Sequence, residues 1–328
     1  MEEWREAVRL GPNFAEQYYL LSLSYMSLNR LDEAEAVCKQ AKERKLDTEA
    51  LLQARYWLAF LNGDAERMAQ VASTAQGKPG AEDLLLAMQA DTEGWYGKLK
   101  NAHELTGRAM DSAQRNNAKE TAGDIRQRQH CARWKFGYRE QARADSNAAA
   151  KLAPNRDARA ISALALARAG DTAGAEKLAA ELDKAFPLDT LIQRYWLPTI
   201  RAAVYLERKD PNRAIELLKV ANPIELSSIT ADLTIFMCPV YVRGEAYLML
   251  HDGDRAAAEF RKFIEHRGVV MNFPWGALAR LGLARAYVME GDTAKARAAY
   301  QDFLAISKDA DTDIPIYEQA KAEYAKLQ

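Results

Sequence analysis

The chain has 328 residues, and with 48% hydrophobic and 28% charged residues its composition excludes a disordered polypeptide. Its 45 lysines and arginines nearly balance 46 aspartates and glutamates, which excludes a global field that would attract nucleic acid or anionic lipid. No apolar run approaches the roughly 18 residues that a membrane-spanning helix needs. The length is sufficient for two ordinary domains or for one long repeat array.

The first residues of the chain have the pattern of the second half of a helical repeat. Trp4, Ala7 and Pro12 supply a bulky residue, a small residue and a terminating proline. No first helix precedes them in the sequence. We therefore expect residues 1–12 to be the second half of a truncated repeat, and the chain to be a piece of a longer polypeptide or to carry an open N-terminal stacking face.

A pattern of small and bulky residues recurs through residues 13–313. The set Gly244, Tyr247, Ala256, Phe260 and Phe263 returns 40 residues later as Ala284, Tyr287, Ala296, Tyr300 and Phe303. Residues three and four apart share one face of a helix, so each set predicts two packed helices. One residue near the start of each second helix recurs at intervals along the chain, and we call these eight residues the ladder: Ala34, Met68, Ala102, Ala142, Ala175, Ala214, Ala256 and Ala296.

Helix-breaking residues separate the predicted helices. Asp64, Asp171 and Asp292 each follow a glycine, an order that suits a helix end followed by the N-cap of the next helix. Pro154 and Pro187 fall where second helices must stop. No alternating β pattern of useful length occurs. The sequence therefore predicts an all-α chain of about eight helical hairpins.

Several segments depart from the pattern. Glu93 and Arg133 stand where a large apolar residue is expected, so we expect an irregular superhelix around residues 90–140. The longer spacings predict longer helices or loops, notably around 222–240 and 266–275.

Two further features concern the C-terminal half. Trp196 is a candidate core residue, and Pro198 is expected either to start a helix or to kink it. Residues 314–328 begin near a proline and are expected to form a capping helix that covers the last apolar face. One stripe of that helix carries Tyr317, Ala320, Tyr324 and Leu327.

The hairpin pattern resembles the tetratricopeptide repeat family, whose unit is a helix–turn–helix of about 34 residues. The resemblance implies a right-handed α–α superhelix, a solenoid of helical hairpins. The strings PVYVRGEAYLML and ARLGLARAYVMEGDTAKARAAYQDFLAISKDADTDIPI are also similar to the C-terminal repeat region of bacterial, chiefly acidobacterial, eukaryotic-like serine/threonine kinases. Some winged-helix transcriptional regulators carry similar regions.

The kinase resemblance implies a regulatory region attached to a kinase or DNA-binding module, often across a single membrane helix. It implies an extracytoplasmic location in a membrane-anchored kinase, and without that context the expectation is the cytoplasm. The residues themselves leave the compartment open.

The sequence carries no recognisable catalytic motif. No kinase glycine-rich loop, H-R-D or D-F-G motif occurs. The four histidines His103, His130, His251 and His266 are too scattered for a metal-ligand set. We therefore expect no enzyme activity, no catalytic residues, no metal and no cofactor.

The stretch from Lys98 to Arg143 is locally basic. Eleven lysines and arginines face five aspartates and glutamates there, an excess of six. An acidic-partner or nucleic-acid patch is one interpretation. A solvated helix surface is the other, and it is favoured because the charges do not follow one helical stripe. No nucleic-acid partner is expected.

The family resemblance implies a concave surface lined by the first helix of each hairpin, with a protein or peptide as the expected partner and self-association as a further mode. In the third hairpin, the positions that would line this concave surface are Ala87, Asp91 and Gly94. The aromatic residues at these groove positions could instead pack against neighbouring helices. The alternative function is that of a small-molecule sensor. The predicted groove residues are Tyr19, Leu23, Met26, Gln53, Trp57, Phe60, Gln127, Trp134, Tyr241 and Arg285.

Overall fold

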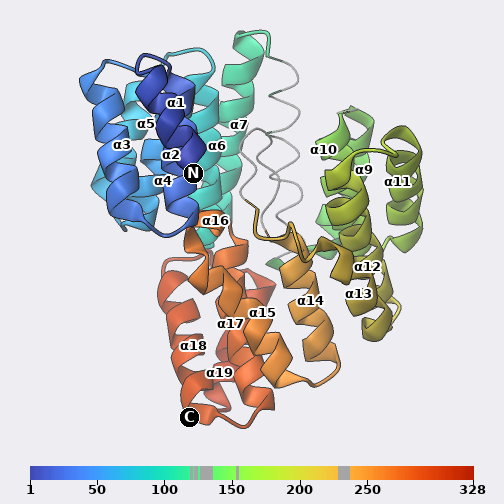
Figure 1. The fold of residues 1–328 in the computed structure, drawn as a ribbon. Helices are drawn as coiled ribbons and strands as arrows, with labels where there is room; N and C mark the ends of the chain where they lie inside the picture. The colour runs from blue at the N-terminus through green and yellow to red at the C-terminus, as the bar shows by residue number, and fades with distance from the viewer. Residues whose placement is uncertain (119–120, 122–124, 126–135, 153–154, 228–236) are drawn as a thin grey trace.

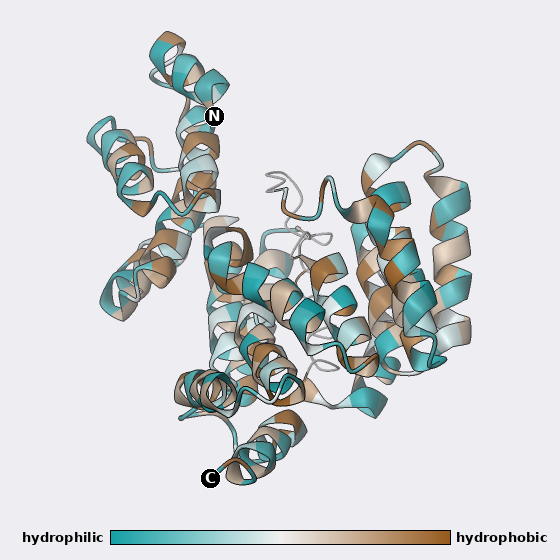
Figure 2. Cartoon of the chain, turned by 60° about the horizontal axis from the view of Figure 1, so that its bottom comes forward, coloured by the Kyte–Doolittle hydropathy of each residue, from teal (hydrophilic) through white to brown (hydrophobic). Residues whose placement is uncertain are grey.

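The computed structural model describes residues 1–118, 121, 125, 136–152, 155–227 and 237–328. Within these residues the regular structure is helical and no strand occurs (Figure 1). In Figure 2 most helices carry both hydrophobic and hydrophilic segments, as expected of helices that bury one face. No helix among the described residues is long and apolar enough to cross a membrane.

Consecutive helices pair into antiparallel hairpins. Seven hairpins lie wholly in the described part of the chain: α2 (Ala15–Ser27) with α3 (Leu31–Glu43), α4 (Glu49–Leu61) with α5 (Ala65–Ala75), α6 (Ala81–Trp95) with α7 (Leu99–Arg115), α10 (Arg156–Arg168) with α11 (Thr172–Ala185), α12 (Leu197–Glu207) with α13 (Pro211–Leu218), α14 (Cys238–Met249) with α15 (Gly253–Glu265), and α17 (Trp275–Met289) with α18 (Thr293–Ile306).

The remaining helices complete or connect the array. Helix α9 (Arg139–Leu152) is the second helix of the expected fourth hairpin, whose first helix, with Arg133, falls mainly outside the described residues. Helix α1 (Glu2–Leu10) packs on α2, and α19 (Pro315–Ala325) packs on α18. The short helix α16 (Arg267–Val270) lies between α15 and α17.

The predicted ladder, which consists of seven alanines and Met68, explains how the hairpins close. Each of the eight ladder residues is the fourth residue of its helix, as Ala34 is in α3 and Ala296 is in α18. All eight side chains are at most 8% exposed. A small side chain at this position allows the two helices of a hairpin to approach closely, so the ladder fixes the repeat geometry.

The predicted helix caps are present. Asp64 accepts a hydrogen bond from the Arg67 amide at 2.9 Å, and Asp171 accepts one from the Gly174 amide at 2.9 Å. Asp292 accepts one from the Lys295 amide at 3.0 Å. Each aspartate satisfies a backbone donor that the first helical turn leaves unpaired, which confirms its assignment as an N-cap.

Pro198 does not start its helix, because residues 190–207 are continuously helical and Pro198 lies in the interior of that stretch. Residues Ile192–Trp196 form a π-helical turn, η2, that leads directly into α12 with Pro198 in its first turn. A proline inside a helix has no N–H to donate to the preceding turn, and the π-helical turn directly before Pro198 is the local distortion that accompanies it. Trp196 is 2% exposed and belongs to the core.

The C-terminal part of the chain packs against the N-terminal hairpins. Helix α16 contacts α2, and α17 contacts α6, where the red and orange helices meet the blue ones in Figure 1. The Asp311 amide also donates a hydrogen bond to the Gly97 carbonyl at 3.1 Å. The connection expected to be long, around 266–275, is the segment that makes the first of these contacts.

Burial makes one cysteine a measurable probe of native packing. The Cys38 side chain is 2% exposed, and desolvation raises the pKa of its thiol to about 11. Because the thiolate is the reactive form, we expect alkylation of Cys38 at pH 8 to be about 100-fold slower in the native protein than in urea. Iodoacetamide labelling followed by peptide-resolved mass spectrometry measures this ratio. Equal rates in the two states would contradict the burial of Cys38.

Candidate binding groove

The inner face of the first two hairpins gathers the N-terminal members of the predicted groove. Tyr19, Leu23 and Met26 lie on α2 with at most 5% exposure. The Tyr19 hydroxyl donates a hydrogen bond to Gln53 Oε1 on α4 at 2.8 Å. Trp57 is 7% exposed. The positional rule therefore brings these residues close together, but their side chains are buried.

Phe60 lies further along α4. It is partly buried and makes an edge-to-face contact with Trp95 of α6, with ring centroids 5.2 Å apart. This contact links the second and third hairpins on the same inner face.

Residues 266–274, which we call the strap, lie against part of this face. The strap connects α15 to α17, and its Asn272 side chain is 3% exposed against α4 and α6. The Trp57 indole N–H donates to Asn272 Oδ1 at 2.9 Å, and Asn272 Nδ2 donates to the Met88 carbonyl at 2.8 Å and to Thr92 Oγ1 at 3.0 Å. The amide thus satisfies its acceptor and both of its donors on this face.

The other end of the strap lies against α2. Asn29 donates from Nδ2 to the Glu265 carbonyl and accepts from the Gly268 amide at 3.2 Å. A Cβ at Gly268 would lie 1.7 Å from the Met26 carbonyl oxygen, so only glycine permits this approach. Close backbone contact therefore replaces an open groove over Met26.

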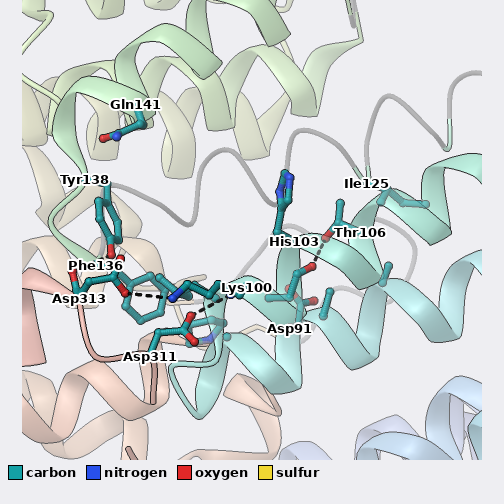
Figure 3. A pocket seen from close by; sticks show the side chains of 16 residues that line it. Asp91, Lys100, His103, Thr106, Ile125, Phe136, Tyr138, Gln141, Asp311 and Asp313 are labelled. Carbon is teal, nitrogen blue, oxygen red and sulfur yellow. Dashed lines mark hydrogen bonds and ion pairs between the residues drawn. The ribbon is translucent and has the colours of Figure 1, made fainter.

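Beyond the strap the inner face opens into a cavity of about 430 Å³ (Figure 3). Its floor is the inner side of α6, with Ala87, Ala90, Asp91 and Gly94, and Pro274 at the end of the strap forms part of one wall. The third-hairpin positions implied by the family rule, Ala87, Asp91 and Gly94, therefore all line this space. The remaining lining residues are Leu99, Lys100, Ala102, His103, Thr106, Ile125, Phe136, Tyr138, Gln141, Asp311 and Asp313.

Polar groups from three separate segments hold the rim of the cavity. The Lys100 amide donates to Asp311 Oδ2 at 2.9 Å, and Lys100 Nζ lies 3.7 Å from Asp313 Oδ1 (Figure 3). The Tyr138 hydroxyl donates to the Asp313 carbonyl at 2.9 Å, and burial raises the pKa of Tyr138. The hydroxyl therefore stays protonated at neutral pH. An apolar floor with a few placed polar groups is the usual composition of a binding pocket.

The other predicted groove residues lie elsewhere. Tyr241 is 8% exposed and packs on Trp275 with ring centroids 4.2 Å apart. Arg285 pairs with Glu323 of the terminal helix at 2.9 Å. Gln127 and Trp134 lie outside the described residues. Partner binding by these ten residues stays a prediction, and the structure places the strap directly against two of them, Met26 and Trp57.

The sequence-based prediction did not identify Asn272, Pro274, Asp311 or Tyr138. The one available signal was the long connection at 266–275, which marked an irregular segment without indicating where it packs. Within the described residues no group of three His, Cys, Asp or Glu side chains lies close enough to hold a metal ion.

The hairpins, the ladder and the caps define a repeat scaffold of the tetratricopeptide type, a solenoid of helical hairpins. The tetratricopeptide repeat family model matches residues 2–48 and 241–311. The two matched segments lie one in each terminal region of the chain. A search of curated proteins found no match.

Solved structures provide further comparisons. Yeast Tom70 is similar over 99% of this chain and 84% of its own, at 14% identity and a TM-score of 0.46. The APC/C hetero-tetramer Cut9–Hcn1 is similar over 95% and 63%, at 14% identity and a TM-score of 0.47. A monomeric mutant of IFIT1 with Gppp-AAAA is similar over 94% and 78%, at 16% identity and a TM-score of 0.44.

Proposed function

We propose that the chain is a protein-interaction scaffold that binds a segment of a partner protein in the open part of its concave groove. The observation that carries the proposal is the cavity over α6, which continues the inner face of the first two hairpins. Its apolar floor suits an anchoring side chain, and its rim offers Lys100, Tyr138 and two aspartates for polar contacts.

We also propose that this scaffold is the regulatory repeat region of a larger bacterial signalling protein. The support is the resemblance of the C-terminal strings to repeat regions of eukaryotic-like kinases. In that setting the scaffold would lie on the extracytoplasmic side of a membrane-anchored kinase. A kinase domain encoded in the same reading frame is the expected finding, and a parent gene without any signalling module would contradict it.

A peptide selection tests the binding proposal. Random 12-residue peptides displayed on phage are panned on the wild-type chain and counter-selected on Ala90→Trp, which places an indole in the cavity. We expect selected peptides to bind Ala90→Trp about tenfold more weakly or worse, because the anchoring pocket is filled. Fluorescence anisotropy measures the two dissociation constants.

The matched control is Ala36→Trp, an equal change at an exposed position of α3. It should leave binding unchanged, and circular dichroism should show that both variants are folded. Failure to enrich any peptide, or equal binding to the wild type and a folded Ala90→Trp variant, would argue against the cavity as the binding site.

A small-molecule sensor is the second candidate, and the cavity volume favours it. About 430 Å³ falls in the range of about 300–1,000 Å³ that small-molecule sites occupy. A ligand present at 100 times its dissociation constant stabilises the folded state by about 2.7 kcal/mol. A thermal-shift screen of a metabolite panel detects such a gain, provided that Ala90→Trp abolishes the shift. A flat screen counts against the sensor.

A further inference from the structure

We propose that a trough between α5 and α7 is a second docking surface, and that it takes an acidic amphipathic segment of a partner protein. The trough has a wide lobe of about 410 Å³ and a narrow lobe of about 210 Å³, which share Ala69 and Gln89 as lining residues. Both α5 and α7 pack on α6 (Figure 1), whose side chains form the floor. The trough is separate from the cavity of Figure 3, so it goes beyond the proposed function.

The trough and the cavity lie on opposite sides of α6. Ala87 lines the cavity, whereas Leu85 and Gln89 line the trough. Successive residues of a helix are about 100° apart, so residues two positions away from Ala87 point away from it. Along α6 the trough extends about 16 Å, from Glu82 to Glu93, which is the length of a helix of about 11 residues. This elongated shape suits a peptide segment.

The wide lobe offers apolar surface to such a segment. Leu105 of α7 and Ile306 at the end of α18 are both partly exposed there. Ala65 and Ala69 of α5 form the facing wall, and both are exposed. Apolar side chains on one face of an occupying helix would cover these residues, as in other helix-in-groove complexes.

The locally basic stretch from Lys98 to Arg143 contributes two cations to the trough. Six of its lysines and arginines lie in the described part of the chain. Four of them pair with acids of this chain: Lys100 with Asp313, Arg115 with Glu82, Arg139 with Glu207 and Arg143 with Glu140. The other two, Lys98 and Arg108, make no ion pair with a described residue, and both line the trough. Lys308 is a third lining cation without such a pair.

Most acids that line the trough are already engaged. Glu82 accepts a hydrogen bond from Ser112 Oγ at 2.8 Å in addition to its ion pair, and Glu93 accepts one from Asn101 Nδ2 at 3.1 Å. Of the lining carboxylates, only Asp309 has no donor among the described residues. Three lining cations therefore lack a carboxylate, so acidic side chains beside the apolar face of the occupant would complement the trough.

The test uses two phage libraries of 12-residue peptides that carry the same apolar residues at helical spacing. The remaining positions are aspartate or glutamate in one library and lysine or arginine in the other. Both libraries are panned on the wild-type chain and counter-selected on Ala69→Trp, because Ala69 is exposed and lines both lobes. We expect binders from the acidic library, and fluorescence anisotropy should show that they bind Ala69→Trp about tenfold more weakly or worse.

The matched control is Gln70→Trp, because Gln70 is the next residue of α5 and is also exposed but does not line the trough. It should bind the selected peptides as the wild type does. Circular dichroism should show that both tryptophan variants are folded.

A charge exchange tests the acidic character of the partner. Arg108→Glu should weaken binding of the selected peptides about tenfold or more, whereas Lys177→Glu, an equal charge change at an exposed position of α11, should not. Replacing the peptide carboxylate that faces Arg108 with lysine should restore binding to Arg108→Glu. A variant that had merely lost its fold would not recover in this way.

Equal yields from the two libraries, equal binding to Arg108→Glu and Lys177→Glu, or the absence of any peptide sensitive to Ala69→Trp would overturn the proposal. Peptides sensitive to Ala90→Trp alone would support the cavity and count against the trough. Peptides sensitive to Ala69→Trp alone would support the trough and count against the cavity, so the two proposals fail separately. A fluorescent 12-nucleotide single-stranded DNA that binds in place of any acidic peptide, and loses affinity for Arg108→Glu, would also overturn a protein partner.

Discussion

Replacing Arg243 with methionine is expected to lower the free energy of unfolding by about 3–5 kcal/mol, because two buried carboxylates lose their shared cation. Arg243 is 5% exposed, and its Nη2 lies 2.7 Å from Glu225 Oε2 and 2.8 Å from Glu259 Oε2. Lys262 Nζ also lies near both acids, 3.1 Å from Glu225 and 3.0 Å from Glu259, but its side chain is 28% exposed. After the substitution this partly solvated ammonium is the remaining cation, and it compensates the two buried charges less well than the buried guanidinium does. Urea denaturation followed by circular dichroism measures the loss.

The control for this change is Arg255→Met on the next helix. Arg255 also pairs with a carboxylate, Asp252, but the Arg255 side chain is 62% exposed. Exposed ion pairs contribute little to stability because solvent and salt screen them, so the control should cost far less than Arg243→Met. Equal losses in the two variants would show that burial does not set the strength of the network around Arg243.

Replacing Phe260 with alanine is expected to lower the free energy of unfolding by about 3–5 kcal/mol, since a fully buried ring leaves a cavity that the helices cannot fill. Phe260 has no exposed surface. Its ring lies between two glycines, where an added Cβ would come within 2.8 Å at Gly244 and 2.6 Å at Gly282. Gly244, a small residue of the repeat pattern, thus leaves room for the Phe260 ring.

Phe14→Ala is the matched control, because the Phe14 side chain is 66% exposed at the other end of the chain. Its cost should be within about 0.5 kcal/mol, as for most surface substitutions. The same urea experiment also gives the dependence of stability on denaturant, which should stay constant if only packing has changed. A loss below about 1 kcal/mol for Phe260→Ala would mean that α14, α15 and α17 close around the missing ring.

The local features of the fold could be predicted from sequence because they depend on residues a few positions apart. The Asp64 cap needs only the amide three residues ahead, and the Ala296 ladder position needs only the spacing to its own helix start. The return of the strap could not be predicted this way. Trp57 and Asn272 are 215 residues apart, and no local pattern indicates that they meet.

In the candidate site, too, some residues follow from their position in the repeat and others depend on distant contacts. Ala87, Asp91 and Gly94 follow from the position of each first helix within the repeat, and all three line the cavity. Tyr138 and Asp313, however, reach the rim from segments whose placement depends on how the whole array curves. Buried aromatic residues such as Tyr241 also match the groove positions, because a solenoid uses one apolar pattern for packing and for binding.

The bond between the Gly97 carbonyl and the Asp311 amide has a consequence for how the molecule unfolds. In a linear array each unit contacts only its neighbours, so the units at the end fray first and the rest follow in steps. Here a hydrogen bond connects the end of the final hairpin to the turn after α6, so hairpins that are distant in sequence are in contact. Unfolding of the final hairpin must break these distant contacts, so we expect unfolding of the chain to be highly cooperative. The same distant contacts raise the contact order and should slow refolding.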